Sequence, residues 1–331
     1  METNTNQEPL SFENRIDIQP ILTKLEKVKS ELAQVIVGQK KMIDLLLVSM
    51  LADGHVLIEG VPGIAKTLTA KSLAKTLALD FKRIQFTPDL MPSDILGTSI
   101  FDLKKNEFEF KRGPIFANMV LIDEINRAPA KTQAALFEVM EERQITIDGK
   151  EFIMDKPFLV VATQNPIEQE GTYRLPEAQL DRFLFKIQID YPNANEELEL
   201  LKREHLLKNQ DKTSLVHMEI SKTDLGNFQQ ITKQIVVEEH LIQYIANIVL
   251  QTRENPFLYM GASPRASIAL LNASKGLAIL RGRDFVTPED IKEIAIPVLN
   301  HRVILSPERE MEGMTTNEVI TQIVESIEIP R

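Results

Sequence analysis

Hydrophobic residues in the first half of the chain recur with two different spacings. Short runs of β-prone apolar residues predict buried strands, and apolar residues at every third or fourth position predict helices between some of them. Strands that alternate with helices indicate a mostly parallel sheet covered on both faces. The expected strands are 55–60, 83–86, 119–123, 158–163 and 184–189, and the expected helices are 15–34, 40–52, 66–78 and 130–142.

Beyond residue 193 the pattern changes to long helical repeats with almost no strand signal. The clearest expected helices are 195–208, 238–252, 264–280 and 288–300; the last begins with Thr287 as N-cap and Pro288 at the first helical position. We therefore expect three parts: a flexible N-terminal tail over 1–14, an α/β core over 15–192, and a smaller all-helical domain over 193–331.

Composition narrows the classes of function. The formal net charge is −10, which argues against a dedicated nucleic-acid coat protein but leaves room for a basic face. The chain has no cysteine, which excludes disulfides, thiolate metal sites and cysteine nucleophiles. No apolar run approaches the ~20 residues that span a bilayer. The polar N-terminus lacks a signal peptide, so we expect no membrane insertion and a cytoplasmic location.

Residues 60–67 (GVPGIAKT) lie between an expected strand and an expected helix, the context that a phosphate-binding loop requires. Backbone N–H groups of such a loop surround the phosphates at a helix N-terminus. Lys66 would reach the β- and γ-phosphates, and the Thr67 hydroxyl would bind Mg²⁺. The strict pattern has glycine before the lysine, and this chain has Ala65. An alanine fits there without strain only if its φ is negative; the other reading is a Gly/Pro turn before a lysine-bearing helix.

Polar residues follow two of the expected strands. Asp123 and Glu124 end the strand 119–123, where they would face the ligand crevice of an α/β sheet. Asp123 would lie beside Mg²⁺, and Glu124 would polarise the attacking water as general base; the alternative is a helix-capping acid pair. Asn165 follows the strand 158–163 and could hold the same water or the γ-phosphate. Its local sequence, before Pro166, favours an ordinary turn asparagine.

Taken in order, five motifs resemble the AAA+ ATPases, and specifically the MoxR family: GVPGIAKT, LIDEINRA, ATQNP, LPEAQLDRF and GASPRA. The resemblance covers about residues 30–310, and the alanine before Lys66 matches the MoxR form of the loop. It implies a P-loop AAA+ core with a parallel sheet flanked by helices, followed by a helical lid. ATP would bind between core and lid, with Mg²⁺ at Thr67 and Asp123. The expected nucleotide contacts are Val37, Gly38, Gly60, Val61, Pro62, Gly63, Ile64, Ala65, Lys66, Thr67, Leu68 and Asp123.

The resemblance also assigns three residues that spacing alone could not. Asn165 matches sensor 1, and Arg265 matches sensor 2, a lid arginine that touches the γ-phosphate. Arg182 matches an arginine finger that acts on the neighbouring subunit's ATP, which implies a ring, usually a homo-hexamer. Arg174 is the rival finger. Both Arg182 and Arg265 could instead be surface salt-bridge arginines, which contribute little.

The implied function is ATP hydrolysis that remodels or assembles protein complexes, with a protein client and a partner carrying a von Willebrand factor A domain. One alternative is a nucleic-acid motor or loader, for which the insert 88–118 supplies Lys104, Lys105, Lys111 and Arg112. Another is a nucleotide-gated scaffold that hydrolyses poorly, against which the Asp123–Glu124 pair argues. The insert resembles one that interrupts helix 2 in this branch of the family. An expected β-hairpin at 144–153, turning at Asp148-Gly149, could face a ring pore, and the alternative for both is surface decoration.

Overall fold

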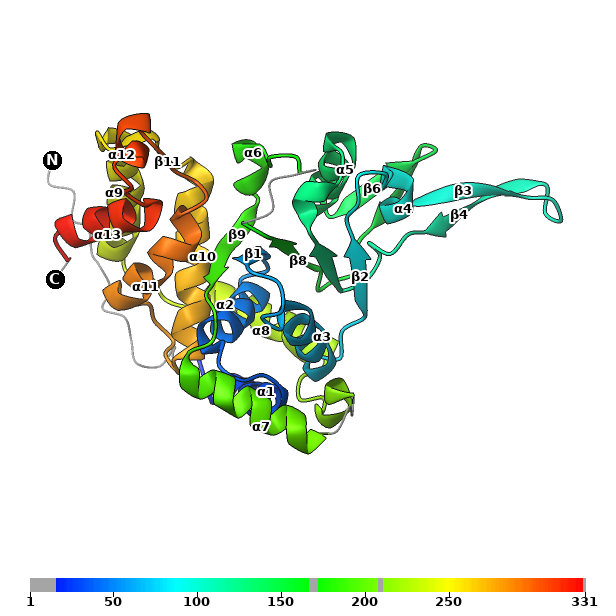
Figure 1. The fold of residues 1–331 in the computed structure, drawn as a ribbon, viewed down its shortest axis with the longest axis horizontal. Helices are drawn as coiled ribbons and strands as arrows, with labels where there is room; N and C mark the ends of the chain where they lie inside the picture. Colours follow the sequence, from blue (N-terminus) through cyan, green and yellow to red (C-terminus); the bar gives the residue numbers. More distant parts are fainter. Residues whose placement is uncertain (1–15, 167–171, 208–210, 330–331) are drawn as a thin grey trace, which may run out of the picture.

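A five-stranded, entirely parallel sheet forms the centre of the molecule (Figure 1). The structure is a computed structural model that describes residues 16–166, 172–207 and 211–329, so the tail expected over 1–14 lies outside the described residues. The parallel sheet confirms the expected α/β core. Its strands, in spatial order, are β2 (Phe81–Gln85), β5 (Met119–Asp123), β8 (Leu159–Gln164), β1 (His55–Gly60) and β9 (Phe183–Ile189).

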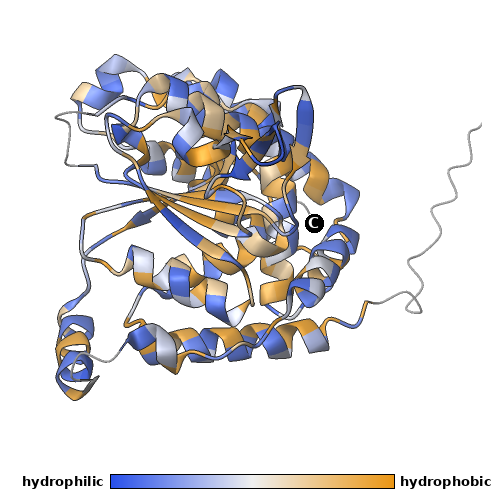
Figure 2. Ribbon diagram, turned by 90° about the vertical axis from the view of Figure 1, so that its right-hand side faces the viewer, coloured by the Kyte–Doolittle hydropathy of each residue, from blue (hydrophilic) through white to orange (hydrophobic). Residues whose placement is uncertain are grey.

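Alternate side chains of the central strands enter two separate hydrophobic cores. On β1, Val56 and Ile58 belong to one core and Leu57 to the other, because successive residues of a strand point to opposite faces. Figure 2 shows the hydrophobic strands between layers of helices. The first core is built with α1 (Gln19–Val35), α2 (Lys40–Leu51) and α3 (Lys66–Thr76), and the second with α4 (Pro92–Leu96) and α5 (Ala130–Glu142).

Two β-hairpins extend the core. One pairs β6 (Gln144–Ile147) with β7 (Lys150–Ile153), and its turn residues Asp148 and Gly149 both have positive φ, which confirms the expected hairpin. The other pairs β3 (Gly97–Asp102) with β4 (Glu107–Arg112) within the insert and projects away from the sheet (Figure 1).

From Ala194 onward the described chain is helical except for the short pair β10 (Leu258–Met260) and β11 (Ile304–Leu305) and one isolated bridge between Val236 and Phe285. Helix α10 (Pro264–Leu280) packs closely on α2, because a Cβ on Gly276 would lie 3.2 Å from the carbonyl oxygen of Val48. The helical lid therefore lies directly against the core; its boundary near residue 193 stays a prediction. The remaining elements are η2 (Ile125–Arg127), α6 (Glu177–Leu180), α7 (Ala194–Leu207), η3 (Lys212–Leu215), α8 (Lys222–Gln234), α9 (Glu239–Glu254), α11 (Pro288–Leu299), α12 (Pro307–Met311) and α13 (Thr316–Ser326). None of the described helices is long and apolar enough to span a membrane.

Candidate nucleotide-binding site

The phosphate loop connects the carboxyl end of β1 to the first turn of α3. Lys66 opens that helix, and its Nζ donates to the carbonyl oxygen of Gly60 at 2.5 Å, so the lysine lies back across the loop. Gly63 has a φ of +86°, and a Cβ there would meet no atom within 4 Å. The backbone at Gly63 is therefore open to a ligand, as a loop that surrounds phosphates requires.

Ala65 does not meet the condition for an unstrained alanine. Its φ is +59° and its ψ is 21°, in the left-handed region. An L-residue with a Cβ pays roughly 1–2 kcal/mol in this conformation. The strain lies at the residue that precedes Lys66, where the chain turns from the loop into α3, and such strained residues cluster at ligand-binding sites.

The two acids occupy the carboxyl end of β5 and are held by neighbouring elements. Asp123 accepts a hydrogen bond from the hydroxyl of Thr163 at 3.1 Å, and its other oxygen pairs with Nε of Arg83 at 2.6 Å. The carboxylate is nearly buried, with 10% of the side chain exposed. Thr163 also accepts a hydrogen bond from the backbone N–H of Glu124 at 3.1 Å. A single hydroxyl on β8 thus fixes both acids.

Glu124 has a φ of +57° and turns its side chain toward β2 and η2. One carboxylate oxygen accepts from Nε2 of Gln85 at 2.7 Å and pairs with Nε of Arg127 at 3.0 Å. Burial lowers the pKa of Lys66, and the charges of Asp123 and Glu124 act in the opposite direction. The lysine and both acids therefore share one electrostatic site.

Strand order brings Asn165 to the same edge. Glu59 pairs with Gln164 in the β1–β8 register, so Asn165 lies level with Gly60, where the phosphate loop begins. The structure thus brings together the loop, the two acids and Asn165, as the sequence predicted. The roles of these residues stay predictions.

A cavity of about 290 Å³ lies beside the loop. Arg203 on α7 lines it and donates to the carbonyl oxygen of Ala33 at 2.6 Å, which holds α7 over the cavity. Gly38 lies against α7 as well, because a Cβ there would come within 2.6 Å of the Glu196 carboxylate. Six of the expected nucleotide contacts line this cavity: Val37, Pro62, Gly63, Ile64, Ala65 and Leu68.

The oxygen-bearing side chains at this edge suit Mg²⁺, which binds partly through water and phosphate, better than they suit a metal ion bound only by protein side chains. Within the described ranges, no group of three or more His, Asp or Glu side chains could hold a metal ion. Mg²⁺ commonly keeps several waters and binds through one or two protein oxygens plus substrate phosphates. Thr67, at the start of α3, and Asp123 are residues of that kind.

Arg182 lies at the opposite end of the sheet from the phosphate loop. It directly precedes β9, whose register pairs Phe183 with His55 and Ile189 with Gly60. Six residues of strand separate those levels, or roughly 20 Å. Arg182 donates to the carbonyl oxygen of Phe137 on α5 at 2.9 Å.

Arg265, at the start of α10, lies beside Arg182. Nη2 of Arg265 is 2.6 Å from one oxygen of Glu141, and Nη1 of Arg182 is 3.4 Å from the other. Glu141 therefore holds Arg265 at the far end of the sheet, away from the phosphate loop of its own chain. Its role as the lid arginine that touches a γ-phosphate stays a prediction. Arg174 is 85% exposed and pairs with Glu177 at 3.2 Å.

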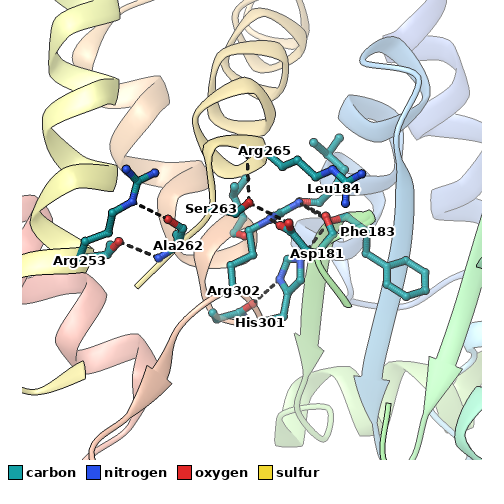
Figure 3. A network of polar contacts seen from close by, with 12 residues as sticks. Asp181, Phe183, Leu184, Arg253, Ala262, Ser263, Arg265, His301 and Arg302 are labelled. Atoms are coloured by element: carbon teal, nitrogen blue, oxygen red, sulfur yellow. Dashed lines mark hydrogen bonds and ion pairs between the residues drawn. The ribbon is translucent and has the colours of Figure 1, made fainter. Parts of the chain in front are cut away.

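A polar network connects the lid to the start of β9 (Figure 3). Asp181 accepts from the hydroxyl of Ser263 and from Nε of Arg302, both at 2.8 Å. Arg302 is almost wholly buried and also donates to the carbonyl oxygens of Phe183 and Leu184. The residues next to Arg182 and Arg265 are thus joined across the domain boundary.

Sequence reasoning missed several polar residues of these sites, among them Arg83, Gln85, Glu141 and Thr163. Thr163 and Gln85 carry a detectable signal, because they are polar residues near the carboxyl ends of expected strands. Arg83 carries none, because it begins the expected strand 83–86. Nothing in its local sequence distinguishes Glu141 from Glu142.

Comparison with known proteins supports the resemblance to the MoxR family of AAA+ ATPases. The model of the ATPase family associated with various cellular activities (AAA) matches residues 55–185, and the AAA lid domain matches residues 250–323. The chain is 45% identical to "Chaperone MoxR1" of Mycobacterium tuberculosis, over 93% of this chain and 82% of that protein. The chain belongs to the MoxR family of AAA+ ATPases.

Further relatives agree. This MoxR-family chain is 45% identical to the uncharacterized protein YeaC of Bacillus subtilis over 95% of this chain and 96% of the relative. It is 28% identical to "Protein MoxR" of Methylorubrum extorquens over 92% of this chain and 94% of that protein. The crystal structure of a candidate ATPase from Cytophaga hutchinsonii superposes with a TM-score of 0.88 at 45% identity, covering 95% of this chain and 97% of that one.

Proposed function

We propose that this MoxR-family protein hydrolyses ATP and uses the energy to remodel or assemble protein complexes. The observation that carries the proposal is the meeting of the phosphate loop, Asp123, Glu124 and the 290 Å³ cavity at one edge of the sheet. A phosphate cradle, oxygen ligands and a carboxylate base are the parts that phosphoryl transfer to water needs.

Each residue has a separate task in the proposed reaction. The loop N–H groups and Lys66 bind the phosphates, and Thr67 and Asp123 hold Mg²⁺, which neutralises charge on the phosphates when it is bound. Glu124 accepts a proton from the attacking water, and Asn165 orients that water or the γ-phosphate. Because Gln85 and Arg127 hold Glu124 in the structure, the carboxylate would rotate away from them to act as base.

The position of the arginines supports a ring. Arg182 and Arg265 lie at the opposite end of the sheet from their own phosphate loop, so they would reach a nucleotide only in a neighbouring subunit. A surface that binds a different surface of the next copy generates a closed ring or a filament. We propose a closed homo-hexamer in which each ATP lies at a subunit boundary.

A protein is the proposed client, and a protein with a von Willebrand factor A domain is the proposed partner. The chaperone name of the Mycobacterium tuberculosis relative supports a protein client. The basic residues of the β3–β4 hairpin, which motivated a nucleic-acid alternative, are interspersed with Asp102, Glu107 and Glu109. That mixture does not form the basic stripe typical of a nucleic-acid surface.

Substitution of Glu124 tests the proposal. Glu124→Gln should lower the ATPase rate about 10²–10⁴-fold, because it removes the base, and leave ATP binding nearly unchanged. Lys66→Ala should instead weaken ATP binding by at least about tenfold, because a charge-assisted contact to phosphate is lost. Glu142→Gln is the matched control, since Glu142 is an exposed acid on α5. Equal ATPase rates in the wild type and Glu124→Gln would overturn the base assignment.

A further inference from the structure

Two arginines from different domains share one carboxylate at the end of the sheet remote from the phosphate loop. Glu141, in the last turn of α5, places one oxygen 2.6 Å from Arg265 and the other 3.4 Å from Arg182. The three side chains are partly open to solvent: 35% of Glu141, 26% of Arg182 and 49% of Arg265 is exposed. The arginine heads are therefore held, yet accessible from outside the chain.

The two oxygens of a carboxylate explain how the arginines can lie together. Two neighbouring guanidinium groups repel each other, and the negative charge of Glu141 offsets that repulsion: one oxygen accepts a hydrogen bond from Arg265 and the other forms an ion pair with Arg182. A glutamine there would offer a single acceptor oxygen and an NH₂ group, which faces a guanidinium donor against donor. Replacement by glutamine should therefore release at least one of the two arginines.

The backbone around each arginine is already fixed by the network in Figure 3. Asp181, the neighbour of Arg182, accepts from the Ser263 hydroxyl, and Ser263 caps the helix that carries Arg265 two residues later. These contacts fix where both side chains begin, and the carbonyl oxygen of Phe137 accepts from the Arg182 guanidinium. Glu141 therefore places the guanidinium of Arg265 beside that of Arg182.

We propose that Glu141 is a positioning residue that holds Arg182 and Arg265 side by side as one binding site for the triphosphate of the neighbouring subunit. The proposal rests on the proposed ATPase ring and deepens it. Two adjacent guanidinium groups match the paired oxygens of phosphates, and one carboxylate leaves the cluster with a net positive charge. The incoming phosphates would replace Glu141 as acceptors without having to collect the two arginines from separate positions.

The first test compares Glu141→Gln with Glu142→Gln, which removes the same charge one residue away on the same helix. Glu141→Gln should lower the ATPase rate by about 10–100-fold, because misplacing a charged group at a reaction centre has effects of that order. Measured on unassembled subunits, its affinity for a fluorescent ATP analogue should stay at the wild-type value, since Glu141 is remote from its own phosphate loop. Glu142→Gln should change neither quantity.

The second test mixes variants as unassembled subunits before ATP is added. Glu141→Gln with Glu124→Gln should give more activity than the sum of the two separate proteins, because a mixed boundary can combine an intact base with intact arginines. Glu141→Gln with Arg182→Ala should give no gain, because both defects lie on the same face of the subunit.

The outcomes separate the inference from the proposed function. Wild-type activity in Glu141→Gln, no gain with Glu124→Gln, or a gain with Arg182→Ala would each overturn the role of Glu141 and leave the ATPase proposal standing. A wild-type protein that does not hydrolyse ATP would overturn the proposed function itself. A changed affinity for the ATP analogue in unassembled Glu141→Gln subunits would show that the substitution acts on its own site, and would also overturn the inference.

Discussion

Ala65, the residue before the phosphate-loop lysine, has a backbone conformation that suits glycine. Ala65→Gly should raise the free energy of unfolding by about 0.5–1 kcal/mol, because relief of the left-handed strain exceeds the added entropy of an unfolded glycine. Urea denaturation measures the change. Ala78→Gly is the control, because Ala78 also has a positive φ, +49°, and lies after α3 rather than in the loop. A loss of stability in Ala65→Gly, with a gain in Ala78→Gly, would show that the Ala65 methyl contributes more by packing than it costs by strain.

Residues of the candidate site were predictable where a local pattern carries them. Asp123 and Glu124 lie at a strand end, and Lys66 lies between a loop and a helix, each with a recognisable neighbouring sequence. Arg83 and Glu141 were not predictable, because their partners come from other elements and depend on strand order and lid position. The location of Arg265 at the far end of the sheet follows from the same tertiary packing.

At the scale of elements, helices with a continuous apolar stripe were predicted best. The expected helices 130–142 and 264–280 coincide with α5 and α10. Helix α8 was not predicted, although Ser221 and Asp224 form a capping box at its start; it contains Gly226 and buries Leu225, Phe228 and Thr232. The ends of helices shift by a few residues because fraying and capping decide them.

Two buried histidines, His55 and His301, should make the stability of the fold depend on pH. Burial lowers the pKa of His55 on β1 to about 3, and burial also lowers the pKa of His301. The unfolded chain takes up these protons below about pH 6.5 and the folded chain does not. The stability contributed by the neutral histidines should therefore be complete above pH 6.5 and fall below it, by up to about 1.4 kcal/mol per pH unit for each histidine.

Urea denaturation at several pH values between 5 and 8 measures that slope. His55 accepts from the backbone N–H of Val160 and contacts the carbonyl oxygen of Met140, so His55→Gln should lower stability at pH 7.5 and make the pH dependence below 6.5 shallower. An unchanged slope in His55→Gln would mean that other groups cause the acid sensitivity.

On the scale of the whole molecule, the phosphate loop and the Arg182–Arg265 pair lie at opposite ends of one sheet. Nucleotide at a subunit boundary binds the assembled state better than the free subunit and shifts mass toward it. Sedimentation at several protein concentrations should therefore show more assembly with a slowly hydrolysed ATP analogue than without it. Lys66→Ala should lose this dependence. A strictly monomeric protein with full ATPase activity would contradict the ring.

The surroundings of Arg182 and Arg174 decide which of them reaches the neighbouring nucleotide. Arg182 is anchored to α5 and lies beside Arg265. Arg174 is almost fully exposed, and it forms an ion pair with Glu177, three residues further along the chain. An anchored arginine loses less conformational entropy when it contacts phosphate. Arg182→Ala should therefore lose most ATP hydrolysis while ATP binding persists, and Arg174→Ala should keep most of its ATP hydrolysis.

Mixing Arg182→Ala with Glu124→Gln subunits should restore activity, because the Arg182→Ala subunit supplies the base and the Glu124→Gln subunit supplies the arginine. Loss of hydrolysis in Arg174→Ala alone, with Arg182→Ala active, would reverse the assignment and leave Arg182 as a contact between lid and core.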